Sequence, residues 1–541
     1  MLRILLFVLA LHSFAFSIDI TLEFLESKPK GLARDFYIWR FLSDEKTNLQ
    51  DALKAYELIF RKNAKLTALV EKKGMPHELP KDLLCKKLDF DTLLTQDMEC
   101  IVFGLRLSQI PSLEAQKLQK LQAVIATNEN LSKKVQILSS KAILTNMLTS
   151  DAKTFAQIFN ALSENQKATI INQNIKPQRL KVLAEEQNAY FDKIIQNTIL
   201  SDSLPKFKKS LLNAHIKKTY SGYTLFLLGI HELLANNKTN ALEYFALAQN
   251  ASKDPLFINK ALFWRYLVSQ NKALLSELAK STNIDIYTLY ALEKLNTAPN
   301  YTILSGFENL KSEPAPFDIS DPFQWEILRA NLLKVSDSKN LLELLDEFGF
   351  EGLQPHLAFI HARATKFQNN YFLTPFSDSL SWKDTSQKAL TYAIARQESH
   401  FLPALISTSY ALGMMQIMPF NVAPFAKSMG KQDIELEDMF NPVLALEFGR
   451  FYLDELRAEF KHPLLVSYAY NGGPGFLRRT LKKGNLFLKK RKFEPWISME
   501  LIPYEESRTY GLKVLANYIV YQRLFGNNTR LENIIKQIPL R

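Results

Sequence analysis

Glycine and cysteine are both scarce in this chain. Only 17 of its 541 residues are glycine, roughly 3% against a usual ~7%. Large β-sandwiches and barrels need glycine at turns and bulges, so this scarcity favours helices joined by short connections. Two cysteines are too few for a disulfide-rich scaffold or a multi-cysteine metal cluster. We therefore expect an all-α protein, with no cofactor and no metal.

Acidic residues are also outnumbered, 55 against 67 basic ones, which gives a formal charge of +12. Such a surface suits nucleic acid, anionic lipid or an acidic polymer. The first residues of the chain indicate which of these three kinds of partner to expect. Arg3 is followed by an apolar run from Ile4 to Ala10, and Ala15-Phe16-Ser17 places small residues at a cleavage site. This predicts a secretory signal peptide over residues 1–17, too short to span a membrane, with a buried N-terminal helix as the alternative.

Export argues against nucleic acid as a partner and places the protein outside the cytosol, in the periplasm. No cysteine follows the apolar run, so no lipid anchor is expected. An oxidising compartment permits a disulfide between Cys85 and Cys100, but two buried free thiols remain an alternative.

Residues 18–377 read as one helix after another. Leu118 to Ala126 and Thr154 to Leu162 repeat apolar residues at three- and four-residue spacing. Tyr223 to Ala279 resembles stacked helical hairpins that bury their apolar faces only against neighbours, as in an α-solenoid. No strict repeat period is present. This region is either plain scaffold or a basic surface that holds a long polymer.

The glycine content rises near residue 377, because 9 of the 17 glycines fall in residues 378–541. A helix from about Ser386 to Gln397 ends at Glu398. A carboxylate at the negative end of a helix, beside apolar groups such as Phe401, is expected to have a raised pKa. That property suits a general acid at neutral pH.

Three further motifs follow Glu398. Ala411 to Pro419 is predicted to be a glycine turn that leads into a methionine-rich helix. Ser467 to Gly475 is predicted to be a helix end that breaks into a glycine-rich loop, and the third motif is Glu500 to Tyr510. Between them, Asn441-Pro442 predicts the start of a support helix that continues to Phe460. Tyrosines, amides and methionines around an acid suit an uncharged, amide-bearing ligand such as an N-acetylated sugar.

This set resembles the soluble lytic transglycosylases of bacterial cell walls, whose catalytic domain is goose-lysozyme-like. The motifs that carry the resemblance are Arg396-Gln397-Glu398-Ser399, Gly413-Met414-Met415-Gln416-Ile417-Met418-Pro419, Ala469-Tyr470-Asn471-Gly472-Gly473 and Glu500-Leu501-Ile502-Pro503. Met414 stands where the family usually has leucine, a volume-conserving change. The resemblance implies an α-superhelical solenoid over residues 18–377 and a lysozyme-like catalytic domain over residues 378–541.

The family cleaves the β-1,4 bond between N-acetylmuramic acid and N-acetylglucosamine, as a carbon–oxygen lyase. By resemblance, Glu398 first protonates the glycosidic oxygen. It then takes the proton of the muramic acid C6 hydroxyl, which closes on C1 to give a 1,6-anhydromuramoyl end. The residues expected to bind substrate are Ser407, Gln416, Met418, Tyr452, Tyr470, Asn471 and Glu500.

Some of these roles have alternatives. Ser407 and Tyr452 could be ordinary loop or core residues, and Glu500 could equally be a structural ion-pair partner. His400 reads as a rim residue. The nearest candidates for a second carboxylate, Glu435, Glu437 and Asp438, precede the Asn441 cap as an acidic surface loop.

The expected partners are the glycan strands and stem peptides of peptidoglycan, with cell-wall synthesis or division proteins as further candidates. A monomer is expected. Two rival functions stay open: a muramidase that hydrolyses the same bond with water, and a non-catalytic wall-binding scaffold.

Overall fold

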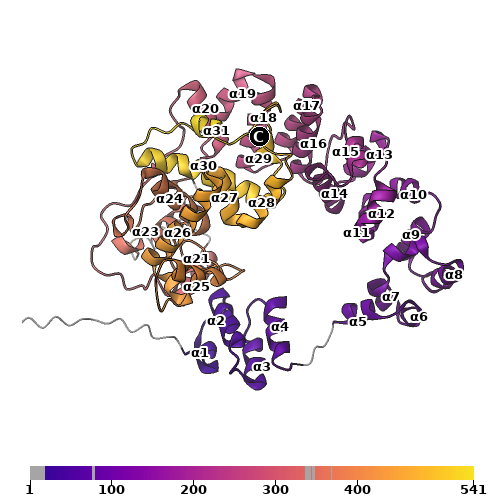
Figure 1. The fold of residues 1–541 in the computed structure, drawn as a ribbon, viewed down its shortest axis with the longest axis horizontal. Coiled ribbons are helices and arrows are strands. Elements are labelled where there is room, and N and C mark those ends of the chain that lie inside the picture. The colour runs from indigo at the N-terminus through magenta and orange to yellow at the C-terminus, as the bar shows by residue number, and fades with distance from the viewer. Residues whose placement is uncertain (1–18, 76–79, 336–340, 342, 344–347, 367) are drawn as a thin grey trace, which may run out of the picture. The chain divides into compact units, whose positions relative to one another are not determined.

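We describe the fold from a computed structural model (Figure 1), which covers residues 19–75, 80–335, 341, 343, 348–366 and 368–541. The predicted signal peptide lies outside this range. The chain forms two compact units, each assembled from separated segments. Unit 1 combines residues 1–76, 302–470 and 517–528, and unit 2 combines residues 77–301, 471–516 and 529–541. The boundary expected between residues 377 and 378 falls within unit 1 and stays a prediction.

The all-α prediction is confirmed, since helices dominate the described part of the chain, where β structure is limited to one short parallel pairing of β1 with β2 and three isolated bridges. The elements of unit 1 are α1 (Leu22–Ser27), α2 (Leu32–Ser43), α3 (Leu49–Glu57), α4 (Ala64–Lys72), β1 (Ile303–Leu304), α21 (Pro322–Lys334), η3 (Glu351–Leu353), α23 (Gln354–Ala364), β2 (Asn370–Tyr371), η4 (Ser377–Ser379), α24 (Thr385–Ser399), α25 (Pro419–Ser428), η5 (Leu436–Phe440) and α26 (Pro442–Phe460). Two helices run from unit 1 into unit 2 or back, α27 (Pro463–Gly472) and α30 (Glu505–Leu524).

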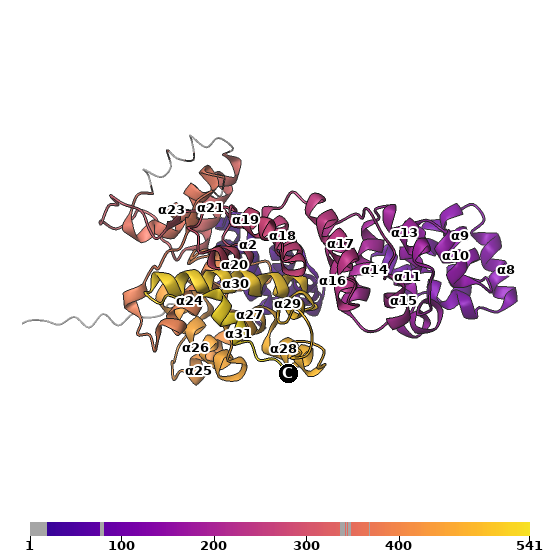
Figure 2. The same ribbon diagram turned by 90° about the horizontal axis from the view of Figure 1, so that it is seen from above.

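Unit 2 is a row of short helices in which each packs mainly on its neighbours in sequence (Figures 1 and 2). They are α5 (Lys81–Lys87), α6 (Phe90–Leu93), α7 (Met98–Gly104), η1 (Leu107–Ser112), α8 (Ala115–Val124), α9 (Glu129–Leu138), α10 (Ile143–Thr149), α11 (Ala152–Ala161), α12 (Glu164–Gln166), η2 (Lys167–Ile171), α13 (Pro177–Glu185), α14 (Ala189–Leu200), α15 (Pro205–Ser210), α16 (Gly222–Leu234), α17 (Lys238–Asn250), α18 (Pro255–Ser269), α19 (Lys272–Leu278) and α20 (Ile286–Leu295), joined by α28 (Pro474–Lys482), α29 (Trp496–Glu500) and α31 (Leu531–Lys536).

The helix predictions for this row hold. The two helices expected from spacing appear as α8 and α11, and the stacked hairpins appear as α16 to α19. Short polar side chains start many of these helices. Asp151, for example, accepts a hydrogen bond from the backbone N–H of Thr154, which satisfies a donor at the helix start.

Helix α2 packs on the segment that carries the candidate site, although residues 18–377 were expected to form a separate domain. Phe36 contacts the rings of Tyr410 and Phe440, with centroids 6.2 and 6.4 Å apart. Trp39 stacks on Tyr410 at 5.7 Å. These rings are buried or half-buried, so apolar burial holds the N-terminal helices of unit 1 to its later segments.

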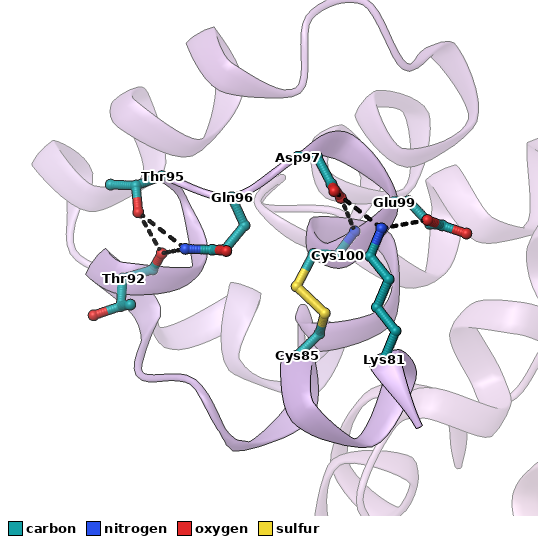
Figure 3. Close-up of a disulfide and its surroundings, with 8 residues drawn as sticks. All are labelled: Lys81, Cys85, Thr92, Thr95, Gln96, Asp97, Glu99 and Cys100. Carbon is teal, nitrogen blue, oxygen red and sulfur yellow. Dashed lines mark hydrogen bonds and ion pairs between the residues drawn. A yellow bond between two sulfur atoms is a disulfide. The ribbon is translucent and has the colours of Figure 1, made fainter. Parts of the chain in front are cut away.

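The two cysteines form a disulfide, which settles the alternative that the sequence left open (Figure 3). Cys85 of α5 joins Cys100 of α7, with a Cα–Cα distance of 5.3 Å. Asp97 caps α7 by accepting a hydrogen bond from the N–H of Cys100, 2.8 Å long. The crosslink closes the α5–α7 hairpin.

Nowhere in the described ranges is a helix both long and apolar enough to cross a membrane.

Candidate active site

The site is built around the C-terminal end of α24, which places Glu398 in its last turn. Asp384 caps the start of this helix by accepting a hydrogen bond from the N–H of Gln387. His400, exposed and left-handed with φ 52°, ends it. The body of the helix is buried, while Glu398 itself is half-buried. The expected carboxylate at a helix end, partly desolvated and still reachable, is therefore present.

Two neighbours of Glu398 fix the end of α24. The Arg396 guanidinium donates to the Tyr371 carbonyl at 2.7 Å and to Asn517 Oδ1 at 2.8 Å. The Ser399 hydroxyl donates to the Met414 carbonyl at 2.7 Å, and Ser399 is 2% exposed. The first motif thus ties the helix end to the turn that carries the second motif.

The second motif is not a helix, which corrects the sequence prediction. Leu412 pairs with Ile417 by an isolated bridge, with a turn between them, and the helix begins only at Pro419. The reason lies in the backbone: Gly413 has φ 69° and Gln416 has φ 50°, and neither angle fits a right-handed helix. Gly413 also packs so closely on the Met439 carbonyl oxygen that a Cβ there would overlap it.

Three of the expected binding residues line this turn and the loop before it. The Gln416 amide donates to the carbonyl oxygens of Leu405, at 3.1 Å, and Gly413, at 2.8 Å. The Ser407 hydroxyl accepts from the N–H of Ala411 at 2.9 Å, so it shapes the loop. Met418 is half-buried and immediately precedes α25.

Tyr470, near the end of α27, contacts the Gly413 turn and lies near Glu398. Its hydroxyl donates to the Met415 carbonyl at 2.7 Å. Burial raises the pKa of Tyr470 well above its usual value, and the nearby charge of Glu398 raises it further. The Tyr452 ring lies 5.3 Å from the Tyr470 ring, centroid to centroid. The structure therefore brings Glu398, the Gly413 turn, Tyr452 and Tyr470 together in unit 1.

The acidic loop is occupied by structural contacts. Arg40 of α2 forms ion pairs with Glu437 and, at 3.9 Å, with Glu435. Asp438 accepts a hydrogen bond from the N–H of Glu435 at 2.8 Å, as one half of a capping box. The three candidates for a second carboxylate thus hold α2 and the η5 turn in place. Sequence reasoning missed Arg40, and no local signal pointed to it, because its partners lie nearly 400 positions away.

Asn471 and Glu500 belong to unit 2. Asn471 follows Tyr470 in α27, accepts a hydrogen bond from the Ser507 hydroxyl at 2.7 Å and donates to Glu506 at 3.3 Å. Gly473, with φ 81°, then separates α27 from α28, as the glycine-rich motif predicted.

Glu500 is 1% exposed. Its carboxylate lies 2.5 Å from Lys260 Nζ and accepts a hydrogen bond from the Tyr287 hydroxyl at 2.9 Å. The Trp264 indole N–H lies 3.4 Å from it. Burial lowers the pKa of Lys260, and the charge of Glu500 opposes that shift. This placement matches the ion-pair alternative for Glu500, and Lys260 is a partner that the sequence did not reveal.

Comparison with known proteins finds a matching family for part of the chain. Residues 376–493 match the family described as "Transglycosylase SLT domain". A soluble lytic murein transglycosylase from Salmonella typhimurium is 33% identical over 151 residues, which is 28% of this chain and 22% of that protein. The Escherichia coli K12 protein of the same name is 34% identical over 141 residues, 26% of this chain and 21% of its own length. The matched stretch thus spans about a fifth of these relatives.

Two solved structures align over most of the chain. The 70 kDa soluble lytic transglycosylase SLT70 of Escherichia coli aligns with a TM-score of 0.48 and 17% identity, over 94% of this chain and 83% of that one. The lytic transglycosylase Slt of Pseudomonas aeruginosa aligns with a TM-score of 0.46 and 15% identity, over 93% and 83%.

Proposed function

From the match of residues 376–493 to the family described as "Transglycosylase SLT domain", we propose that this protein is a lytic transglycosylase of peptidoglycan. It cleaves the β-1,4 bond between N-acetylmuramic acid and N-acetylglucosamine. The observation that carries the proposal is Glu398, half-buried at the end of α24 beside Tyr470 and the Gly413 turn. One carboxylate near amide, methionine and tyrosine groups suits an N-acetylated sugar.

In this mechanism Glu398 acts twice. As an acid it protonates the glycosidic oxygen, and the bond from that oxygen to C1 of the muramic acid breaks. The substrate's own N-acetyl group supports the positive centre. As a carboxylate, Glu398 then takes the proton of the C6 hydroxyl while that oxygen bonds to C1. The product ends in 1,6-anhydromuramic acid, no water is consumed, and Glu398 regains its proton.

The acidic loop supports a one-carboxylate route. Standard glycosidases use two carboxylates, and here the nearest candidates are engaged elsewhere. Glu435 and Glu437 face Arg40, and Asp438 caps its own turn. A base that activates water is therefore not supplied by this loop, which favours the anhydro product over hydrolysis by a muramidase.

The remaining site residues are proposed to contribute in different ways. Tyr470, Gln416, Met418 and Tyr452 line the sugar site, and Ser407 shapes its loop. Asn471 contacts the sugar or stem peptide from the end of α27. Glu500 takes the structural role, through its buried ion pair with Lys260.

The same proposal includes the protein's surroundings. A signal peptide over residues 1–17 would export the chain to the periplasm, where it acts on glycan strands as a monomer. The positive charge of +12 would help to retain strands that carry peptide and lactyl carboxylates.

Mass spectrometry of the soluble products from purified sacculi tests the function. We expect muropeptides lighter than their hydrolysed counterparts by one water. Glu398→Gln should lose about 10²–10⁴-fold of the rate, the usual share of a general acid. Glu435→Gln is the matched control and should keep most of it. Reducing-end products without the mass loss would indicate a muramidase, and wall binding without release would indicate a scaffold.

A further inference from the structure

A hollow of about 260 Å³ lies in unit 2 beside helices α11 and α14. The α12 helix and the η2 turn, Lys167–Ile171, contribute to its rim. Its volume is near the lower end of the ~300–1,000 Å³ typical of small-molecule pockets. None of its lining residues belongs to the four motifs that identify the candidate active site.

The lining combines an aromatic ring with amides. Tyr190, at the start of α14, is 66% exposed, so its ring is open to a ligand. Asn160 and Asn197 are exposed as well, and neither side-chain amide hydrogen-bonds to another residue of the described ranges. The floor is apolar and buried, with Ile194 and Leu204. A flat ring beside free amide groups matches the apolar face and the polar edge of a sugar ring.

The charges at the rim are balanced. Lys167 Nζ lies 2.8 Å from a carboxylate oxygen of Glu164, and Lys193 Nζ lies 3.8 Å from one of Glu505. Both pairs are partly exposed, so each lysine already has a counter-charge. A balanced rim favours an uncharged ligand over an acidic peptide.

The rim also has unusual backbone geometry. Residues Lys167–Ile171 form a single π-helical turn, a rare form that often occurs at functional sites. Asn172, which follows it, accepts a hydrogen bond from the N–H of Lys206 at 2.8 Å, and so fixes the turn to the start of α15. A hydrogen bond from a backbone N–H to a side-chain amide oxygen therefore holds the π-helical turn at the rim against α15.

We propose that this hollow binds an N-acetylated amino-sugar ring of a glycan strand, at a place separate from the residues of the cleavage site. The Tyr190 ring stacks on the sugar face, and the Asn160 and Asn197 amides pair with its hydroxyl and acetamido groups. That the strand is peptidoglycan rests on the proposed function; the sugar chemistry rests on the hollow alone. Its effect would be to hold a strand while another part of it is cleaved.

Hydroxyl-radical footprinting of the full chain, with and without the tetramer of N-acetylglucosamine, tests the site. This probe carries sugar but neither charge nor peptide. We expect oxidation of Tyr190 to fall about threefold or more when the sugar stacks on it. Tyr220 is the internal control, because it is 65% exposed in the same unit and lies outside the hollow. Its oxidation should not change.

Met418 in the same sample reports on the cleavage site, which separates the two proposals. Protection of Tyr190 without protection of Met418 would keep this inference and count against the proposed function. Protection of Met418 without protection of Tyr190 would overturn the inference and leave the function standing. Protection of Tyr190 by stem peptide but not by the tetramer would also overturn it.

Substitution provides an independent test. Tyr190→Ala should weaken co-sedimentation of the full chain with sacculi about three- to tenfold, and Asn197→Ala should weaken it less. Tyr220→Ala is the matched control and should have no effect. Turnover of a short soluble glycan fragment should be unchanged in Tyr190→Ala. Equal co-sedimentation of Tyr190→Ala and Tyr220→Ala would contradict the proposal.

Discussion

Gly413 shows how one residue can hold the site in shape. Its backbone is left-handed, which favours glycine, and the Met439 carbonyl oxygen occupies the place of a side chain. The turn that it opens holds Met414, which accepts the Ser399 hydrogen bond at the end of α24. A change at Gly413 therefore moves the support of Glu398.

Replacing Gly413 by alanine is expected to destabilise unit 1 strongly and to abolish cleavage of sacculi. The matched control is Gly430→Ala, because Gly430 has the same φ of 69° but nothing within 4 Å of the added Cβ. The control should cost only the left-handed penalty, about 1–2 kcal/mol. Gly413→Ala should cost several kcal/mol more in urea unfolding. Equal losses in the two variants would show that the contact with Met439 is unimportant.

The Lys260–Glu500 pair leads to a second prediction at this scale. Glu500→Gln or Lys260→Met alone should destabilise unit 2 by about 3–5 kcal/mol, because each leaves a buried charge without its partner. The double variant should lose less than the sum of the two. Unfolding in urea, followed by hydrogen exchange of peptides from unit 2, measures all three. Strictly additive losses would contradict a direct coupling.

At the scale of single residues, the sequence predicted the candidate catalytic residue better than it predicted which distant side chains contact each other. Glu398 could be found because helix spacing and a neighbouring motif are local signals. The partner of Glu500 could not, since Lys260 lies in another helix 240 positions earlier and nothing near it in the sequence marks it. Ion pairs between distant segments depend on packing, which a single sequence does not reveal.

Among the elements, the α5–α7 hairpin is the one closed by a covalent bond. Cys85 is 2% and Cys100 6% exposed, so the disulfide is shielded from solvent. Surface ion pairs of Lys81 with Asp97 and Glu99 add little, since exposed pairs contribute at most ~1 kcal/mol. The disulfide is the main restraint on the hairpin.

Exchanging both cysteines for serine should lower the local stability of α5–α7 by about 3 kcal/mol, the loop-closure value for a separation of 15 residues. Hydrogen exchange of peptides over residues 81–104 measures this effect without assuming two-state unfolding of the whole chain. A reductant should speed exchange there in the parent and change nothing in the double variant. A loss below about 1 kcal/mol would mean that packing alone holds the hairpin.

Element prediction failed at the second motif for a physical reason. Methionine and leucine favour helices, so Met414 to Met418 read as helical. The left-handed backbone angles at Gly413 and Gln416 override that preference. Gly413 packs on Met439, and Gln416 donates a hydrogen bond to Leu405. No local sequence pattern reveals either contact. The α26 helix, by contrast, begins at its predicted Asn441 cap because that signal is local.

For the whole molecule, two buried histidines predict sensitivity to acid, one in each unit. Burial lowers the pKa of His231 to about 4 and that of His356 to about 4, whereas an unfolded histidine titrates near 6.5. The unfolded chain therefore binds more protons between these values. Stability is present in full above about pH 6.5 and is lost as the pH falls toward 4.

We expect each of these histidines to contribute roughly 2–3 kcal/mol to the loss of stability between pH 7 and pH 4. His356→Phe should flatten the pH dependence of unit 1 unfolding, since Trp325 and Phe317 surround the ring at 5.5 and 5.1 Å. His215→Gln, at an exposed position, is the control and should leave the dependence as in the parent. Urea unfolding at several pH values measures the slopes. Parallel slopes for His356→Phe and the parent would contradict this origin.

At the largest scale, the sequence predicted the class of the fold but not its assembly. Spacing and caps gave helices and stacked hairpins, because both depend on neighbours along the chain. It did not predict that helices α1 to α4 join unit 1, since aromatic contacts such as that of Trp39 with Tyr410 join segments hundreds of residues apart. A single domain boundary along the sequence cannot describe two units that are each assembled from separated segments.

The contact between Arg40 and Glu437 also sets an order of events as the chain folds. The two residues are 397 positions apart, so closing the loop between them costs more chain entropy than closing the short loops between neighbouring helices. Until that loop closes, α2 lacks its ring contacts with Tyr410 and Phe440, while the helices of residues 80–301 can already pack on their neighbours in sequence. The row in the middle should therefore mature first, and the first helices of the chain should be among the last to settle.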